Sequence, residues 1–119
     1  MHYQFAQKIH ACTDPHDPPA LVNDRARDVV DLLLLRVLTE TTGHPSPTEI
    51  RAAVEDVFAA RLVEAEATDA PSRSWTTRLT VHPHWEPSFA KAAGSAGLTI
   101  TLADAVAQVN AWLDLIEHA

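Results

Sequence analysis

The chain has 119 residues, of which 46% are hydrophobic and 21% charged, the composition of one soluble domain with a modest core. Its formal net charge of −7 argues against a broad basic face for nucleic acid, because neutralising phosphates needs clustered Lys and Arg. The single cysteine, Cys12, excludes an internal disulfide. With no apolar leader and no membrane-spanning run, the sequence predicts a cytoplasmic protein.

The first predicted helix covers residues 3–12, where apolar residues recur at helical spacing. Gln4 and Lys8 lie one turn apart on a face beside this apolar stripe. Prolines then recur through residues 13–21, which cannot continue a helix and are expected to form an extended loop.

The second predicted helix is the most unusual segment. Asn23 or Asp24 is expected to cap it, and it should end near Thr41. Because it is apolar on nearly every side between residues 29 and 38, it is expected to be buried. Its first turns carry four charged residues, Arg25, Arg27, Asp28 and Asp31. Charges at a buried helix end are tolerated when they are paired or bind something, so this end is a candidate site.

The remaining elements also read as helices. Ser46 and Glu49 form a capping box for a third helix over residues 47–65, with Arg61 on its inner stripe. Residues 69–87 are irregular, a short helix covers 86–96, and a capping box at Thr101 opens the last helix.

The predicted fold class is therefore all-α, a four- to five-helix bundle with a long irregular loop between the third and fourth helices. Residues 1–119 form one domain, in which the second helix is central and packs against the first, third and last. The stretch 75–81 resembles a strand, but it has no obvious partner and is expected to be an ordered loop.

Two interpretations of the charged residues remain open. Lys8 can lay its stem along the first helix or contact a phosphate. Arg25 with Asp28, and Arg27 with Asp31, have the spacing of ordinary helix ion pairs. Arg61 can pair with an aspartate of the second helix or contact a substrate.

A metal site is not predicted. His82 with His84, or Cys12 with His16, could donate ligands, but the spacings typical of zinc sites do not occur. A glycine-rich phosphate loop is also absent from the sequence.

Three motifs resemble the C-terminal half of the AbiEii/AbiGii toxin family of nucleotidyltransferases. The first is Ala-Gln-Lys-Ile-His-Ala at residues 6–11, and the second is Asn-Asp-Arg-Ala-Arg-Asp-Val-Val-Asp-Leu at 23–32. The third is Phe-Ala-Ala-Arg at 58–61. The resemblance covers almost the entire chain, although Gln7 stands where the family commonly has Glu.

This resemblance implies roles for individual residues. Lys8 and Asp28 would be catalytic, with Lys8 contacting nucleotide phosphates. Gln4, Arg25, Asp31 and Arg61 would bind substrate. The complete enzyme would use Mg²⁺ and a nucleoside triphosphate, with tRNA as substrate, in a toxin–antitoxin or phage-defence system.

The family's catalytic core, with its Gly-Ser motif and paired acidic residues for Mg²⁺, has no match in the sequence. We therefore expect a truncated or split form that is inactive alone and completes a site with a separately encoded core; an antitoxin is a second expected partner. The alternative is a non-enzymatic remnant or protein-interaction module whose charges are internal ion pairs. An unrelated helical regulator is disfavoured because a basic DNA-reading surface is missing.

The resemblance also leads to a geometric expectation. Lys8, Asp28 and Arg61 should converge on one concave surface, with Arg25 or Asp31 alongside. A surface where the core docks should leave apolar side chains near the first helix exposed, in particular Tyr3 and Phe5.

Overall fold

The computed structural model describes residues 2–19, 21–70 and 73–119, and it is all-α as the sequence predicts. Its elements are α1 (His2–Cys12), α2 (Ala26–Thr42), α3 (Pro47–Thr68), the 3₁₀ turn η1 (Pro83–Trp85), α4 (Glu86–Ser95) and α5 (Leu102–Glu117). The long irregular connection between the third and fourth helices is confirmed. Across the described ranges no β-strand forms, only an isolated antiparallel bridge between Asp17 and Leu21 in the loop after α1.

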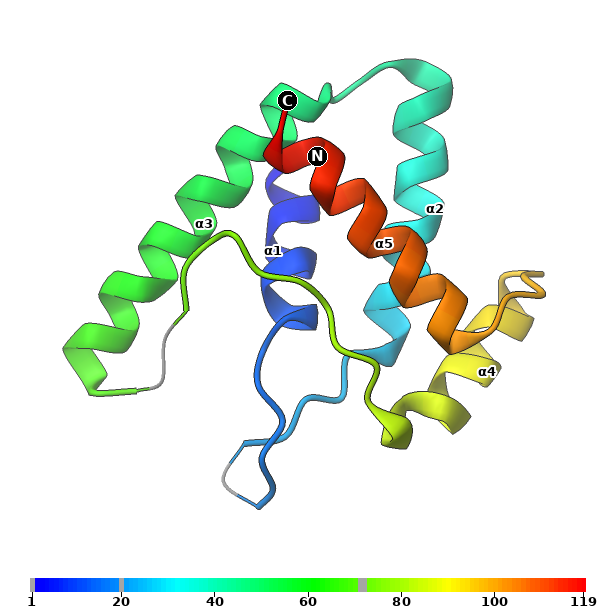
Figure 1. Cartoon of the computed structure of the whole chain (residues 1–119), viewed down its shortest axis with the longest axis horizontal. Coiled ribbons are helices and arrows are strands. Elements are labelled where there is room, and N and C mark those ends of the chain that lie inside the picture. The colour runs from blue at the N-terminus through cyan, green and yellow to red at the C-terminus, as the bar shows by residue number, and fades with distance from the viewer. Residues whose placement is uncertain (1, 20, 71–72) are drawn as a thin grey trace.

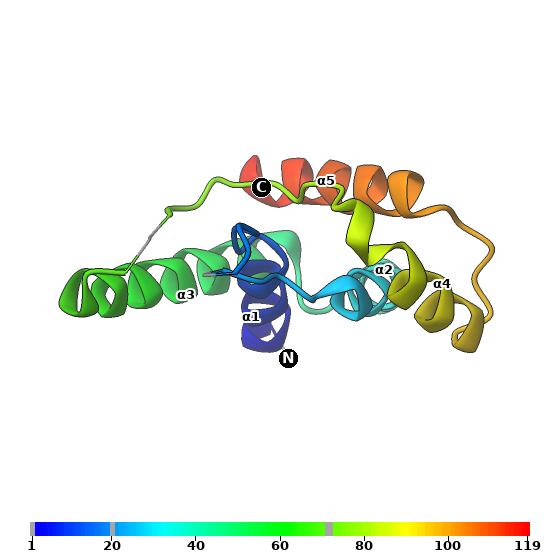
Figure 2. The same cartoon turned by 90° about the horizontal axis from the view of Figure 1, so that it is seen from below.

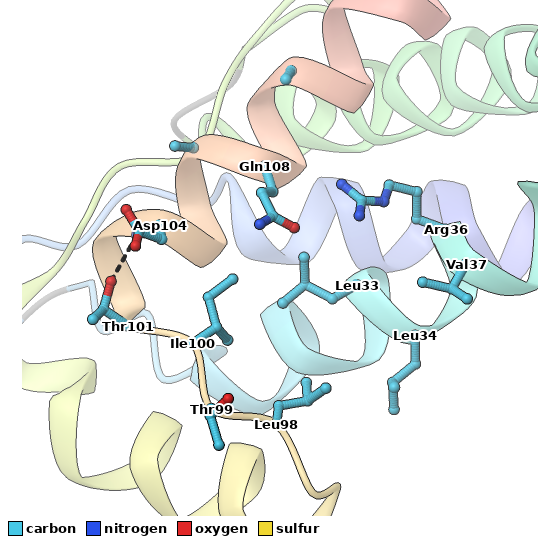
Figure 3. Close-up of a pocket in the computed structure, with 12 residues that line it drawn as sticks. Leu33, Leu34, Arg36, Val37, Leu98, Thr99, Ile100, Thr101, Asp104 and Gln108 are labelled. Carbon is cyan, nitrogen blue, oxygen red and sulfur yellow. Dashed lines mark hydrogen bonds between the residues drawn. The ribbon is translucent and has the colours of Figure 1, made fainter.

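The helix ends follow mostly from local sequence signals. The Ser46 hydroxyl accepts a hydrogen bond from the Glu49 amide, and the Glu49 carboxylate accepts one from the Ser46 amide, which completes the predicted capping box. Gly43 ends α2 in the left-handed conformation, with φ of 75°. At α5 the Thr101 hydroxyl accepts from the Asp104 amide, one half of the capping box expected there (Figure 3).

Two predicted helix ends are wrong. α2 starts at Ala26, with Arg25 at the N-cap position and no side-chain cap, so neither Asn23 nor Asp24 caps it. The Asn23 side chain instead binds the preceding loop, as described below. α3 continues to Thr68, three residues beyond the predicted end, and stops where Asp69 adopts the left-handed conformation.

The helices form two layers. Figure 2 shows α3, α1, α2 and α4 side by side in one layer, with α5 lying across them in the other. The inner face of α5 is buried from Leu102 to Ile116 with a helical period, as the sequence predicts. It meets α1 through Phe5 and Trp112, whose ring centroids are 5.6 Å apart. α5 is therefore the element that closes the core.

The expected order of packing needs correction. α2 packs against α1, α4 and α5, while α3 packs mainly against α1 and also against α5 (Figure 1). α1 thus separates α2 from α3. The sequence does not predict this, because an apolar stripe indicates that one face of a helix is buried but not which helix packs against it.

The apolar side chains of α2 are buried over the first half of the helix only. Val29 and Leu32 are fully buried, but Leu34, Val37 and Leu38 are 42–53% exposed, so the expectation that its apolar run is wholly buried is wrong. Part of this exposed face lines a groove of about 690 Å³ between α2, the segment 98–101 and α5 (Figure 3). α5 crosses α2 at an angle and leaves its C-terminal turns uncovered (Figure 1). None of the described helices is long and apolar enough to cross a membrane.

The segment 73–82 runs as an extended strap from the end of α3 to η1, alongside α5 (Figures 1 and 2). Side chains anchor it. The Arg78 guanidinium binds the carboxylates of Asp114 and Glu117 at 2.6 and 3.0 Å. The backbone of Leu79 exchanges two hydrogen bonds with the Asn110 amide side chain, at 2.9 and 3.1 Å. These anchors account for an ordered segment that has no strand partner.

Candidate functional site

α1 presents Gln4 and Lys8 at the edge of the core because its other face is fixed by burial. Phe5 and Ile9 are fully buried, which sets the rotation of the helix about its axis. Gln4 and Lys8 lie one turn apart and therefore project together toward the start of α2.

Lys8 bridges α1 and α2 through two carboxylates. Its Nζ lies 3.2 Å from Oδ1 of Asp28 and 3.0 Å from Oδ2 of Asp31. Partial burial lowers the pKa of the Lys8 ammonium, but the hydrogen bonds and charges of Asp31 and Asp28 outweigh that effect and raise the pKa overall. Lys8 is therefore held as a cation, with one of its three protons left for another acceptor.

Arg25 adds a second cation at the same place. Its Nη1 is 3.9 Å from Oδ2 of Asp28, and its side chain is 57% exposed. The four charged groups of Lys8, Arg25, Asp28 and Asp31 thus comprise two cations and two anions, with no net charge.

Asn23 fixes the start of α2 relative to two other segments. Its Nδ2 donates to the carbonyls of Cys12 and Asp14, and its Oδ1 accepts from the amide of Arg25. Its own carbonyl accepts from the indole N–H of Trp85 at 2.8 Å. Asn23 is 1% exposed, so these bonds satisfy a buried polar group and position Arg25 and Asp28.

Five of the residues proposed from the sequence line one pocket open to solvent, with a volume of about 370 Å³; these are Gln4, Lys8, Arg25, Asp28 and Arg61. We call it the Lys8 pocket. Asp31 is connected to it through its bond to Lys8. The expected convergence on a concave surface is therefore what the structure shows, whatever the roles of these residues.

Arg61 reaches this pocket differently from the prediction. Its side chain is 53% exposed instead of buried, and it pairs with Glu64 at 3.3 Å. It is not a partner of Asp28 or Asp31. The C-terminal turns of α3 extend beyond the core, so the stripe that is buried up to Phe58 comes out into solvent at Arg61.

The expected apolar exposure near α1 is half wrong. Tyr3 is 46% exposed, although its hydroxyl donates to a carboxylate oxygen of Asp56 at 2.6 Å. Phe5 is fully buried against Trp112 and offers no surface to a partner. Three neighbouring exposed apolar side chains, Leu34, Val37 and Leu38, lie instead on α2.

The pocket fits an anion better than a protein-held Mg²⁺. Lys8, Arg25 and Gln4 offer N–H donors, which suit phosphate oxygens. Asp28 and Asp31 each use an oxygen on Lys8, and no cluster of three or more potential ligands forms in the parts of the chain that the structure describes. The donor set does not fit a Mg²⁺ site supplied by these residues alone.

The histidines considered as metal ligands form a stack of rings. His16 and His84 are stacked with centroids 3.9 Å apart, and His82 lies 5.5 Å from His16 and 5.6 Å from His84. Nδ1 of His16 accepts from the Asn23 amide, and Nε2 of His84 contacts the Asn23 carbonyl at 2.7 Å. The cluster joins the loop after α1 to the turn before α4.

Asn23 is the main site residue that the sequence placed in another role. Its predicted function was a helix cap, and the only sign of a different one is a polar residue preceding the charged turn of a buried helix. Arg73 was not singled out either; it binds Thr13 at 3.2 Å and Asp14 at 2.7 Å, next to the Lys8 pocket.

No protein-family model matches the chain, and no curated protein matches it. The relationship to the AbiEii family therefore stays a prediction carried by the motifs around Lys8, Asp28 and Arg61.

Proposed function

We propose that this chain is the C-terminal helical domain of an AbiEii-like nucleotidyltransferase toxin and that it completes a nucleotide site together with a catalytic core. The observation that supports the proposal is the Lys8 pocket. It gathers Lys8, Arg25 and Asp28 beside Gln4 and Arg61, from α1, the start of α2 and α3.

Each residue has a role that its contacts can support. The free proton of Lys8 and the exposed guanidinium of Arg25 would bind nucleotide phosphates, and Asp28 would hold both cations in place. Phosphoryl-type transfer depends mainly on positioning and charge stabilisation, which such residues provide. The family's Gly-Ser motif followed about ten residues later by an acidic pair does not occur in this sequence, since Gly94-Ser95 is followed at that spacing by Asp104 alone. Activity on tRNA would therefore need a core supplied by another chain or a longer one.

Nucleotide binding tests the proposal on the chain itself. In amide NMR spectra of the ¹⁵N-labelled protein, a Mg²⁺-nucleoside triphosphate at millimolar concentration is expected to shift the signals of Gln4, Lys8 and Arg25. Arg25→Gln should reduce these shifts without affecting stability, because Arg25 is mostly exposed. Arg51→Gln, which removes the same charge from α3, is the matched control.

The alternative is that the charges are structural and the chain is a non-enzymatic interaction module. This alternative is favoured because the two cations and two anions at the pocket pair with one another and leave no net charge. Absence of shifts at the Lys8 pocket with every common nucleoside triphosphate would support this alternative against our proposal. Transfer of labelled nucleotide to tRNA by this chain alone, which we do not expect, would show that no separate core is required.

A further inference from the structure

Among the residues that the structure describes, two of the cations have no acidic partner. The chain has nine Lys and Arg residues, and seven of them have a carboxylate oxygen within 4.0 Å; these are Lys8, Arg25, Arg36, Arg51, Arg61, Arg73 and Arg78. The other two, Arg27 and Lys91, have none among the residues that the structure describes. They are the exceptions in a chain whose other seven cations each have an acidic neighbour.

Both of these cations line the same groove between α2 and α4, which has a volume of about 510 Å³. We call it the α2–α4 groove. Arg27 lies on its α2 wall, while Lys91 lies on its α4 wall together with the hydroxyls of Ser88 and Ser95. Ser88, Lys91 and Ser95 are spaced three and four residues apart, so they share one face of α4.

The α2–α4 groove adjoins the Lys8 pocket. Asp31 lines the groove, and its carboxylate is bonded to Lys8 Nζ at 3.0 Å. Lys8 thereby compensates the one acidic side chain among the groove's lining residues. Arg27 and Lys91 are left to set a positive local charge in a protein whose net charge is −7.

The wall between these cations is partly apolar. Val30 is buried and Leu34 is 43% exposed, and both line the groove. Cations on opposite walls, hydroxyl donors and an apolar surface suit a phosphate ester, whose charged oxygens are attached to an uncharged organic part.

We propose that the α2–α4 groove binds a phosphate ester, and that its ligand is a phosphodiester of the RNA substrate, next to the nucleotide in the Lys8 pocket. The proposal rests on the proposed function for the choice of RNA. Binding of the phosphate itself rests only on Arg27, Lys91 and their surroundings. Arg27 and Lys91 would each contact a phosphate oxygen, and Ser88 and Ser95 would donate hydrogen bonds.

Fluorescence anisotropy with a labelled short single-stranded RNA tests the groove. Arg27→Gln and Lys91→Met are each expected to reduce the salt dependence of binding, lowering the slope of log K against log salt by about 0.7 for one lost phosphate contact. At about 0.1 M salt this corresponds to roughly fivefold weaker binding. Both side chains are exposed and have no carboxylate partner in the described ranges, so these variants should fold like the wild type.

Arg51→Gln separates the groove from overall charge. It removes one positive charge on α3, where Arg51 already pairs with Glu55 at 3.7 Å, and it should leave the salt slope unchanged. The proposal is overturned if Arg27→Gln and Lys91→Met bind RNA like the wild type or lose no more affinity than Arg51→Gln does.

Competition distinguishes the sources of the phosphate. Displacement by unlabelled RNA but not by inorganic phosphate or a mononucleotide at equal phosphate concentration supports the polymer as ligand. Equal displacement by a mononucleotide contradicts the choice of RNA. The amide signals of Gln4 and Arg25 should still shift on addition of nucleotide in Lys91→Met. This would show that loss of RNA binding in the groove leaves nucleotide binding in the Lys8 pocket intact.

Discussion

The two lysines of the chain differ in what surrounds them. Lys8 lies between two carboxylates of a neighbouring helix, whereas Lys91 lines the α2–α4 groove and pairs with no carboxylate among the described residues. The sequence predicts that Lys8 and Asp28 belong together, because Lys8 flanks the apolar stripe of the first helix and Asp28 lies in the first turns of the second. It does not predict the role of Asn23, because bonds from one side chain to scattered backbone groups leave no periodic pattern.

Replacing Lys8 with Met should lower the free energy of unfolding by about 1–2 kcal/mol, because Asp31 would lose its cation and Asp28 would keep only Arg25, at 3.9 Å. Urea denaturation at neutral pH measures this. Since the pKa of Lys8 is raised, the stabilisation is present at neutral pH and is lost only as the pH rises through the folded pKa. Lys91→Met is the matched control and should have no measurable effect.

At the scale of elements, the positions of the helices can be predicted from local sequence signals. Which of their faces are buried against other helices cannot. The Ser46 capping box and the left-handed Gly43 are both visible in the sequence and both set helix ends. The apolar run of α2 does not reveal that only its first half is covered, because coverage depends on the angle at which α5 crosses it. Arg61, assigned to an inner stripe, is exposed because the C-terminal turns of α3 extend beyond the core.

A leucine-to-alanine substitution at two positions of α2 tests whether only the first half of the helix is buried. Leu32→Ala should lower the free energy of unfolding by about 2–5 kcal/mol, because Leu32 is fully buried and its removal leaves a cavity. Leu38→Ala, at a side chain that is 42% exposed, should cost less than about 1 kcal/mol. Equal losses in chemical denaturation would mean that the second half of α2 is covered in solution.

At the scale of the whole molecule, side chains join segments that the helices alone would not hold together. The histidine cluster connects the loop after α1 to the turn before α4, and Nδ1 of His16 must be unprotonated to accept the Asn23 amide. Burial lowers the pKa of His82, and the charges of His16 and His84 lower it further. Burial and the charge of Arg73 likewise lower the pKa of His10. Asp24, 3.4 Å from His84, is the acidic group in contact with the cluster.

Stability should therefore decrease as the pH falls through the unfolded histidine pKa of about 6.5. In that range the unfolded chain binds protons that the folded His82 and His10 do not, so the free energy of unfolding falls with pH. Urea midpoints at about pH 7.5 and about pH 5.5 measure the difference. His82→Gln should reduce the difference, whereas His44→Gln, at an exposed position, should not. A midpoint that rises on acidification would contradict the prediction.

The strap 73–82 has a consequence for chain connectivity. It joins α1–α3 to α4–α5, yet these two halves already meet through the packing of α2 on α4 and of α5 on α2 and α3. Neither half closes the core without the other, since Trp112 of α5 covers Phe5 of α1. Because the strap is anchored to both halves by side chains such as Arg73 and Arg78, the peptide bonds within it are dispensable for the packing. A chain cut within the strap would therefore become two fragments that associate, and each fragment would fold only in the presence of the other.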